Sequence, residues 1–546
     1  MSLHSDEKIT PSAEEKAGPG FVESKEYADA DTNAFGQKDG EQLRHDALLP
    51  RHVAMISIGG VIGTGLFIGT GNSLANGGPV GLWLGYISMA TVCYAMMQPL
   101  GIMVSYMPVP GGHIKLAERF ISPSMSFAMG WLYWFNWTII LPAEVTAAAV
   151  LISFWSPDTS PAIWMSIALL VIIGINFLGT RAFGECEFWF ASIKIICIVG
   201  LIILSFAIDV GAGDQGVLGF RYWRRPGPFV FYNGVPGSLG QFLGYWSVLI
   251  NSAFSFIGTE ICAIAAGEAK NPRKTLPKAI SRVWVRILGF YGTLAISVTC
   301  PSNEPDLILG SKTARSPFVI AIKLAGIKTL PSIVNACFVT SAVSAGSSDL
   351  YTSSRALYGL AIAGQAPRIF AKTTKGGLPW VALLVGVAIS SLSYMSVSAG
   401  GGKVFGWFSN LTSICGMLTW TCIGLLYIRF HAAIKVQNFD QSLLPFKHKG
   451  AIFLAWYVVI WTSLIMLFCG FHVFLAGNWD LATFITSYLP IPLFFILLGV
   501  TWWRDGCKAW VRPEDMDLYS GVQEIIDAEV EEPPPKNLWE KIWQKV

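Results

Sequence analysis

The sequence predicts an all-α integral membrane protein with about twelve spanning helices. Hydrophobic residues make up 53% of the 546-residue chain and charged residues only 13%. The mean hydropathy is +0.52, and this balance is far from that of soluble globular proteins. Apolar runs of roughly 20 residues, the length that crosses a bilayer, recur along the chain. The predicted spans are residues 52–72, 80–106, 124–153, 161–179, 186–208, 240–266, 282–300, 330–357, 380–397, 404–428, 451–475 and 481–503.

The segments outside these spans define the ends and the loops of the protein. The chain divides into a disordered cytosolic N-terminal tail at 1–50, a helical membrane domain at 51–505 and a cytosolic C-terminal tail at 506–546. Clusters of Lys and Arg, as in 270–278, mark the internal loops and place the N-terminus inside. The apolar stretch within 301–329 is too short to span, so we expect an external loop with a helix lying on the surface.

Charge and cysteine usage exclude several classes of function. A net charge of +3 is too small to indicate a nucleic-acid partner. The ten cysteines fall mostly in apolar runs without CxxC spacing, which is typical of small buried hydrophobes rather than of disulfides or metal ligands. No nucleophile and base recur at a spacing that catalysis needs, so we expect neither an enzyme nor a metal site.

The first span carries four glycines in the nine residues GGVIGTGLF, Gly59 to Phe67. Each glycine weakens a helix interior by about 0.5–1 kcal/mol relative to alanine. A dinucleotide-binding loop is excluded, because its GxGxxG pattern would require glycine where the chain has Ile68. Two interpretations remain: a helix-packing face of GxxxG type, and a broken helix that exposes its backbone at a ligand site.

A second interruption occurs in the sixth span, where Gly258 is followed by Thr259 and Glu260. Interrupted helices at matching positions of two halves are the sequence pattern of a transport site at the membrane midplane. Broken ends offer amides that favour a carboxylate and carbonyls that favour an ammonium group. This pairing predicts a site for a zwitterionic amino acid, and packing remains the interpretation only for Gly59 and Gly69, at the ends of the run.

Several motifs in order resemble the fungal amino acid permease family of the amino acid-polyamine-organocation superfamily. They are GGVIGTGLFIGTG, FWFASIKIICIVGLIIL, FSFIGTE, GEAKNPRKTLPKAI and TSAVSAGSSDLYTSSRALYGLA. The resemblance covers roughly residues 45–510 and looks closest to the dicarboxylic and general amino acid permeases. It implies the LeuT-type fold, a 5+5 inverted repeat with broken helices 1 and 6 and two further C-terminal helices.

The resemblance also implies which residues hold the substrate. They are Ile62, Thr64, Gly65, Phe254, Phe256 and Ile257. Amides near Thr64 and Gly65 would hold the α-carboxylate, and the carbonyls of Ile62, Phe254 and Ile257 would accept the α-ammonium group. Both phenylalanines would pack against the substrate and help to close the external gate, although aromatic residues in spanning helices more often face lipid or other helices.

Two ionisable residues within spans are candidates for proton coupling. Glu260 directly follows the interruption of the sixth span, where a carboxylate is costly unless it is paired, protonated or facing water. Lys194 lies deep in the fifth span, where the resemblance implies an ammonium group that stands in for a coupling cation. The alternatives are a structural ion pair and, for the lysine, a side chain that reaches the interface.

Other polar residues within spans are candidates for side-chain specificity. They are Asn136, Glu144, Ser341 and Ser344, with Thr412 and Ser413 as weaker members of the same group. Each alternatively bonds a neighbouring helix, which is common for Ser and Thr. The chain departs from the family at Ile102, where many members have glutamate, and an acidic contact on the internal side is missing.

These observations predict a plasma-membrane transporter that imports amino acids by proton symport, with both termini cytosolic. The alternative is an amino acid receptor of the same fold with little or no transport. The predicted partners are a small-molecule amino acid and membrane lipid, with ubiquitin-ligase adaptors as candidate partners of the cytosolic tails. No cofactor is expected other than H⁺ as the coupling ion.

Overall fold

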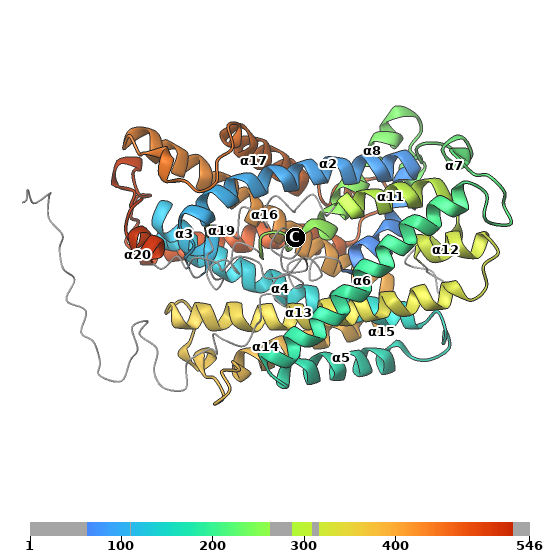
Figure 1. Cartoon of the computed structure of the whole chain (residues 1–546), viewed down its shortest axis with the longest axis horizontal. Coiled ribbons are helices and arrows are strands. Elements are labelled where there is room, and N and C mark those ends of the chain that lie inside the picture. Colours follow the sequence, from blue (N-terminus) through green and yellow to red (C-terminus); the bar gives the residue numbers. More distant parts are fainter. Residues whose placement is uncertain (1–62, 110, 262–272, 274–286, 308–315, 528–546) are drawn as a thin grey trace, which may run out of the picture.

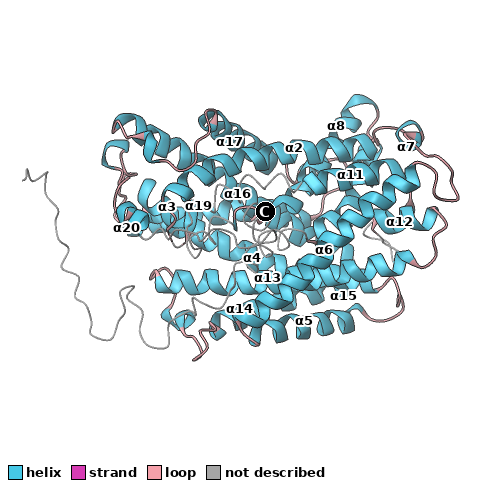
Figure 2. Ribbon diagram, in the orientation of Figure 1, coloured by secondary structure: helices cyan, strands magenta, loops and turns pink. Residues whose placement is uncertain are grey.

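The computed structural model describes residues 63–109, 111–261, 273, 287–307 and 316–527, and every regular element in these ranges is a helix (Figure 1, Figure 2). The elements up to the middle of the chain are η1 (Gly65–Gly69), α2 (Thr70–Tyr106), α3 (Gly112–Phe120), α4 (Pro123–Ile152), α5 (Pro161–Phe177), α6 (Thr180–Asp209), α7 (Arg221–Arg224), η2 (Tyr232–Gly234) and α8 (Gly237–Phe256).

The remaining described elements complete the bundle. They are α11 (Ile287–Thr299), η5 (Pro305–Leu307), α12 (Pro317–Leu324), α13 (Leu330–Ile362), η6 (Arg368–Ala371), α14 (Trp380–Ser390), η7 (Ser391–Met395), α15 (Ser396–Ala399), α16 (Gly401–Val436), η8 (Gln441–Leu443), α17 (Ala451–Leu467), η9 (Phe471–Phe474), α18 (Leu481–Tyr488), α19 (Pro490–Arg504), η10 (Pro513–Asp515) and α20 (Val522–Asp527). The bundle is elongated, with α3 and α20 at one end, the α20 end, and α7 and α12 at the other, the α12 end (Figure 1).

Helix length and surface chemistry confirm a multi-pass membrane protein. Six of the described helices are long and apolar enough to cross a membrane, and α18 with α19, bent by 45° at their junction, would make a seventh. The outer side of α6 exposes large apolar side chains, among them Trp189, Ile196 and Phe206. A row of this kind is costly in water and favourable in lipid. The all-α fold class predicted from the sequence is therefore confirmed.

A glycine separates the first two predicted spans. The helix that begins at η1 runs through to Gly77, and Gly78 then adopts a φ of 75° before α2 resumes with Pro79. A Cβ atom at Gly78 would lie 2.8 Å from the carbonyl oxygen of Pro228 and 2.8 Å from the Cα atom of Phe229. Only glycine fits this conformation and this close approach.

The prediction of a surface helix within 301–329 is wrong. Helix α12 occupies part of that segment, and its residues Pro317–Ile322 are all buried. The helix packs against η1, α6, α11 and α13, because its first six residues, Pro317–Ile322, are all apolar and must be covered on every side. The ring of Phe318 lies 6.5 Å from that of Phe338, which stacks on Phe67 of η1 at 4.3 Å.

The C-terminal residues 511–522 form a strap across the α20 end of the bundle. The Val511 amide donates to the Ile121 carbonyl at 2.9 Å, and the Tyr106 hydroxyl donates to the Leu518 carbonyl at 2.8 Å. The Leu518 side chain is fully buried. The predicted C-terminal tail therefore starts as an ordered segment that joins α2 to the start of α4.

An ion pair also attaches this strap to α3. The Arg119 guanidinium on α3 donates to the Asp517 carboxylate and to the Ser520 carbonyl. Partial burial raises the pKa of Asp517, but hydrogen bonds from Ser520 and Arg119 outweigh it and lower the pKa to about 2. Asp517 is therefore ionised throughout the physiological pH range.

Candidate functional site

The sixth predicted span is interrupted where its glycine predicts. Helix α8 ends at Phe256, Ile257 is extended with φ −63° and ψ 148°, and Gly258 has a φ of 93°. A Cβ atom on Gly258 would lie 3.1 Å from the indole of Trp137 on α4. The helix cannot continue through this conformation, so the last carbonyls of α8 lose the amide donors that another turn would supply.

The segment in which the first interruption is predicted lies beside this one. Described structure begins at Gly63, and Gly65–Gly69 forms a single π-helical turn, a geometry that occurs often at functional sites. A Cβ atom on Gly65 would lie 2.7 Å from the Ser255 hydroxyl and 2.9 Å from the Phe254 ring. The two interrupted segments are thus in direct contact, and Phe254 and Ser255 cover the backbone of Gly65.

Packing does not explain every glycine of the run. A Cβ atom on Gly69 would meet nothing within 4 Å, so the interpretation of Gly69 as a helix-packing residue is wrong. Gly59 and Ile62, for which the sequence predicts a packing contact and a substrate-binding carbonyl, lie outside the described residues. Of the glycines in the described part of the run, Gly65 makes the closest approach to another helix, and only backbone or a very small group fits there.

The carboxylate of Glu144 reaches the first interruption from α4. The Thr64 hydroxyl donates to Glu144 Oε1 at 3.0 Å, and a Cβ atom on Gly63 would lie 3.0 Å from the same oxygen. Both side chains are buried. The structure therefore joins Thr64, a predicted substrate-binding residue, to Glu144, a predicted specificity residue.

A cluster of ionisable side chains, here called the Lys194 cluster, continues from Glu144 into the bundle. It consists of Glu144 on α4, Glu187 and Lys194 on α6, and Asp349 on α13. Lys194 Nζ lies 3.8 Å from Glu187 Oε1, and Asp349 is close enough to the other three for electrostatic interaction. Every member is at most 3% exposed, so the alternative in which Lys194 reaches the membrane interface is wrong.

The Lys194 cluster carries more acidic groups than basic ones. Among the described residues it brings three carboxyl groups to a single ammonium group, and full ionisation would leave two negative charges uncompensated in the membrane interior. The Ser344 hydroxyl donates to Glu187 Oε2 at 2.7 Å, which gives this predicted specificity residue a contact with the cluster. Such an arrangement can hold a proton and pass it between carboxyl groups within the protein interior.

Glu260, the other predicted coupling residue, contacts α16. Its Oε2 atom accepts a hydrogen bond of 3.1 Å from the Trp420 indole of α16, and both side chains are buried. The carboxyl group therefore connects the interrupted segment to α16, whereas the Lys194 cluster connects α4, α6 and α13.

The predicted aromatic residues divide between two partners. The Phe254 ring packs edge-on against Phe405 of α16 at 5.7 Å and also covers Gly65. The Phe256 ring lies 6.1 Å from that of Tyr86 on α2. Phe254 is thus placed at the contact between the interruptions, and Phe256 lies against α2.

Three other positions singled out in the sequence are buried in the bundle. Asn136 and Ser341 are at most 2% exposed. Ile102 is also 2% exposed and belongs to the apolar core. The position at which the family pattern has glutamate is therefore an apolar packing position in this chain.

Glu187 and Asp349 were not predicted as site residues from the sequence. Glu187 precedes Lys194 by seven residues, about two helical turns, which places both on one face of α6. That spacing could have revealed the pair. Asp349 lies in a serine-rich run of α13, and no spacing in the sequence connects it to α6.

Comparisons with known proteins find relatives over most of the chain. The family model described as "Amino acid permease" matches residues 52–512. The chain is 38% identical to the proline-specific permease of Emericella nidulans, over 98% of this chain and 99% of that protein. It is 41% identical to the dicarboxylic amino acid permease of Saccharomyces cerevisiae, over 91% and 83% respectively. It is 39% identical to a lysine/arginine permease of Candida albicans, over 96% and 93%.

Proposed function

The chain belongs to the amino acid permease family, and on that premise we propose that it imports amino acids across the plasma membrane by proton symport. The observation that carries the proposal is the hydrogen bond between Thr64 and Glu144. It connects the interrupted backbone, which suits a zwitterion, to the Lys194 cluster, which suits a proton. The two termini face the cytosol in this proposal, and the strap lies on that side.

The substrate would be bound mainly by backbone groups. The amides of Thr64 and Gly65 start a helix and favour the α-carboxylate, and the carbonyls of Phe254 and Ile257 at the end of α8 favour the α-ammonium group. Because Phe254 and Ser255 cover Gly65, a substrate reaches that amide only when the Phe254 ring moves aside. Phe254 therefore acts as a gate on the substrate-binding backbone.

Coupling would arise because the carboxyl group of Glu144 binds the proton and also lies next to the site of the substrate carboxylate. A proton on Glu144 removes a negative charge next to the site of the substrate carboxylate, and this makes substrate binding more favourable. By linkage, a bound substrate carboxylate makes protonation of Glu144 more favourable to the same degree. Glu260 is the second candidate, and it would act through Trp420 and α16 instead.

Uptake of radiolabelled amino acids by permease-deficient cells tests the function. Proline, lysine and aspartate represent the neutral, basic and acidic substrates named for the relatives. We expect at least one to accumulate, with faster uptake at acidic external pH. Binding to the purified protein without accumulation would favour the receptor, and neither binding nor uptake would contradict the proposal.

Paired variants test the coupling route. Thr64→Val removes the hydroxyl hydrogen bond with little change of shape, and Glu144→Gln removes the proton site. If both act through one contact, the double variant should be little worse than the more damaging single variant. Glu260→Gln is the matched comparison, and loss of pH dependence in that variant alone would move the coupling site to Glu260.

A further inference from the structure

The strap, residues 511–522, has two halves that bind different helices. The first half lies against the end of α16, where the Gln437 amide donates to the carbonyls of Pro513 and Met516 at 2.8 Å each. The second half lies against α2, whose Tyr106 hydroxyl donates to a strap carbonyl at 2.8 Å. The strap therefore joins α16 to α2 at the end of the bundle where α3 and α20 lie (Figure 1).

Arg429 of α16 strengthens the attachment of the first half. Its guanidinium donates to the Val511 carbonyl and, at 3.1 Å, to the Phe120 carbonyl at the end of α3. The Phe120 ring also stacks on that of Phe430 of α16 at 5.2 Å. In this conformation α3 and α16 are thus held together by direct contacts, and the strap adds a link that runs over them.

Alternate residues anchor the second half. Met516 and Leu518 are at most 2% exposed, whereas Asp517 and Tyr519 between and after them are exposed. A period of two is that of an extended chain. An extended segment held by two buried side chains and a few hydrogen bonds opens at lower cost than a packed helix, so the strap can detach while the bundle stays folded.

The strap has no slack between its two attachments. Gln437 binds the Met516 carbonyl and Tyr106 binds the Leu518 carbonyl. Two residues span at most about 7 Å, and the backbone of Met516 is already extended, with φ −70° and ψ 122°. The end of α2 therefore cannot move away from the end of α16 while both attachments are intact.

The two attachments belong to different groups of helices. Helix α2 packs against both η1 and α8, the interrupted segments, whereas α16 packs against α4, which carries Glu144. Alternating access in transporters with paired interrupted helices is largely a rigid-body movement of one group against the other around the site. A movement that separates α2 from α16 at this end must first release one half of the strap.

We propose that the strap is an internal latch, which must release either α16 or α2 before the substrate site opens to the cytosol. The proposal rests on the proposed transport function and on the cytosolic position given there to the strap. The strength of the two attachments would set the fraction of chains that face inward. Tyr106 and Gln437 would then control the conformational step without touching substrate.

Single side-chain groups can be removed from each attachment. Tyr106→Phe removes the hydroxyl donor and keeps the ring, which lies 5.3 Å from that of Phe439. Gln437→Leu removes the amide donor to the first half. Each should raise the inward-open population by about two- to tenfold, as expected for the loss of a hydrogen bond. Glu514→Gln is the matched control, because this side chain lies in the same strap and is exposed.

Spin labels on α3 and α16 measure the separation directly. The purified full chain would carry Lys115→Cys and Lys435→Cys, both at exposed positions, and Cys507→Ser to remove an exposed native thiol. Double electron–electron resonance should show mainly one short distance in the parent chain and in Glu514→Gln. A longer distance should gain population in Tyr106→Phe and in Gln437→Leu.

The double variant tests whether release of either half is sufficient. If it is, the increases in the longer-distance population should add, whereas two contacts that both have to break would multiply their effects. A multiplied increase would contradict release of either half. Leu518→Ala removes a fully buried anchor and should give the largest increase among the single variants, and unchanged distances in this variant would overturn the latch.

Uptake by the same variants distinguishes the latch from the transport function. Chains that rest facing inward cannot bind substrate outside, so the half-saturating external concentration should rise in Tyr106→Phe and Gln437→Leu, but not in Glu514→Gln. A wild type that transports, with unchanged distances and half-saturation in every variant, would overturn the latch alone. A wild type that transports no amino acid would refute the proposed function.

Discussion

Gly65→Ala is the sharpest test of the contact between the two interrupted helices. The added methyl group would lie 2.7 Å from the Ser255 hydroxyl, 2.9 Å from the Phe254 ring and 3.2 Å from the Ser255 Cα atom. The side-chain atoms can rotate away, but the backbone atom cannot, so α8 must shift. Overpacking of this kind costs about 1–3 kcal/mol, which corresponds to a loss of about five- to 150-fold in the closed conformation.

Gly69→Ala is the matched control for this change. It lies one turn later in the same helical segment, and its new methyl group would meet nothing within 4 Å. An alanine there removes a weak helix former, so we expect unchanged or slightly higher stability, by up to about 1 kcal/mol.

The assay combines thermal stability of the purified protein with initial rates of amino acid uptake in permease-deficient cells. Gly65→Ala should lower both, whereas Gly69→Ala should resemble the wild type. If the two variants behave alike, the contact of Gly65 with Phe254 and Ser255 does not matter for function, and the proposed gate is refuted.

Three further predictions concern the other contacts of the described residues. Gly258→Ala should destabilise the protein by about 1–3 kcal/mol in thermal unfolding, because alanine is strained at a φ of 93° and meets Trp137; an unchanged melting temperature would refute this. Trp420→Phe removes the indole donor to Glu260 and should lower the free energy of unfolding by about 1–3 kcal/mol. Adding Glu260→Gln to this variant should cause no further loss. The strap should resist limited proteolysis equally at all pH values above about 4. Its attachment to the bundle should weaken as acid protonates Asp517 from about pH 4 to 2. At neutral pH, Asp517→Asn should lower the free energy of that attachment by about 1 kcal/mol.

Local chemistry explains what the sequence predicted correctly. The helical class follows from long apolar runs, since lipid leaves backbone groups no partner outside a helix. The end of α8 follows from Gly258, because glycine adopts the left-handed conformation, which breaks the helical hydrogen-bonding pattern, without steric cost. Gly65 was predicted at the first interruption by the same logic, and the structure places it against Phe254 and Ser255 of α8.

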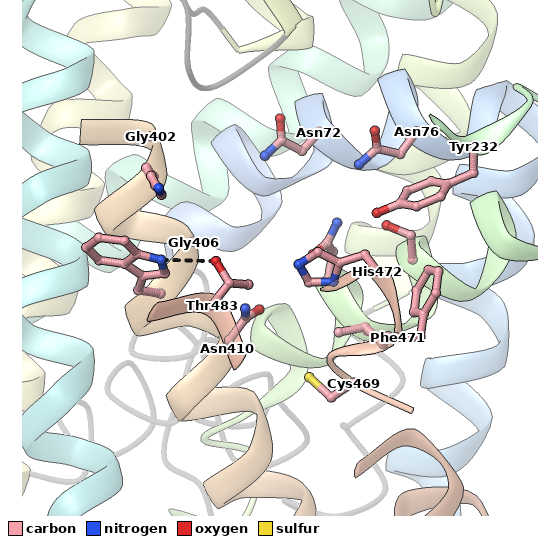
Figure 3. A pocket seen from close by; sticks show the side chains of 15 residues that line it. Asn72, Asn76, Tyr232, Gly402, Gly406, Asn410, Cys469, Phe471, His472 and Thr483 are labelled. Carbon is pink, nitrogen blue, oxygen red and sulfur yellow. Dashed lines mark hydrogen bonds between the residues drawn. The ribbon is translucent and has the colours of Figure 1, made fainter. Parts of the chain in front are cut away.

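Tertiary context explains what the sequence did not predict. Helix α12 has the length and composition of either a surface or a core helix, and only its packing against four neighbours decides that it is buried. Asp349 joins Lys194 because α13 crosses α6, and helix crossings are not encoded in local spacing. The pocket in Figure 3 joins side chains from α2, α8, α16 and the link between α17 and α18, and none of their motifs is unusual alone.

Proton coupling is tested most directly by the pH of a lightly buffered medium around permease-deficient cells that express the chain, after a transported amino acid is added. We predict that the medium becomes more alkaline as the amino acid enters, and that this change is lost in Glu144→Gln even where some uptake remains. Uptake of amino acid without any movement of protons would contradict it, as would an unchanged proton signal in the Glu144→Gln variant.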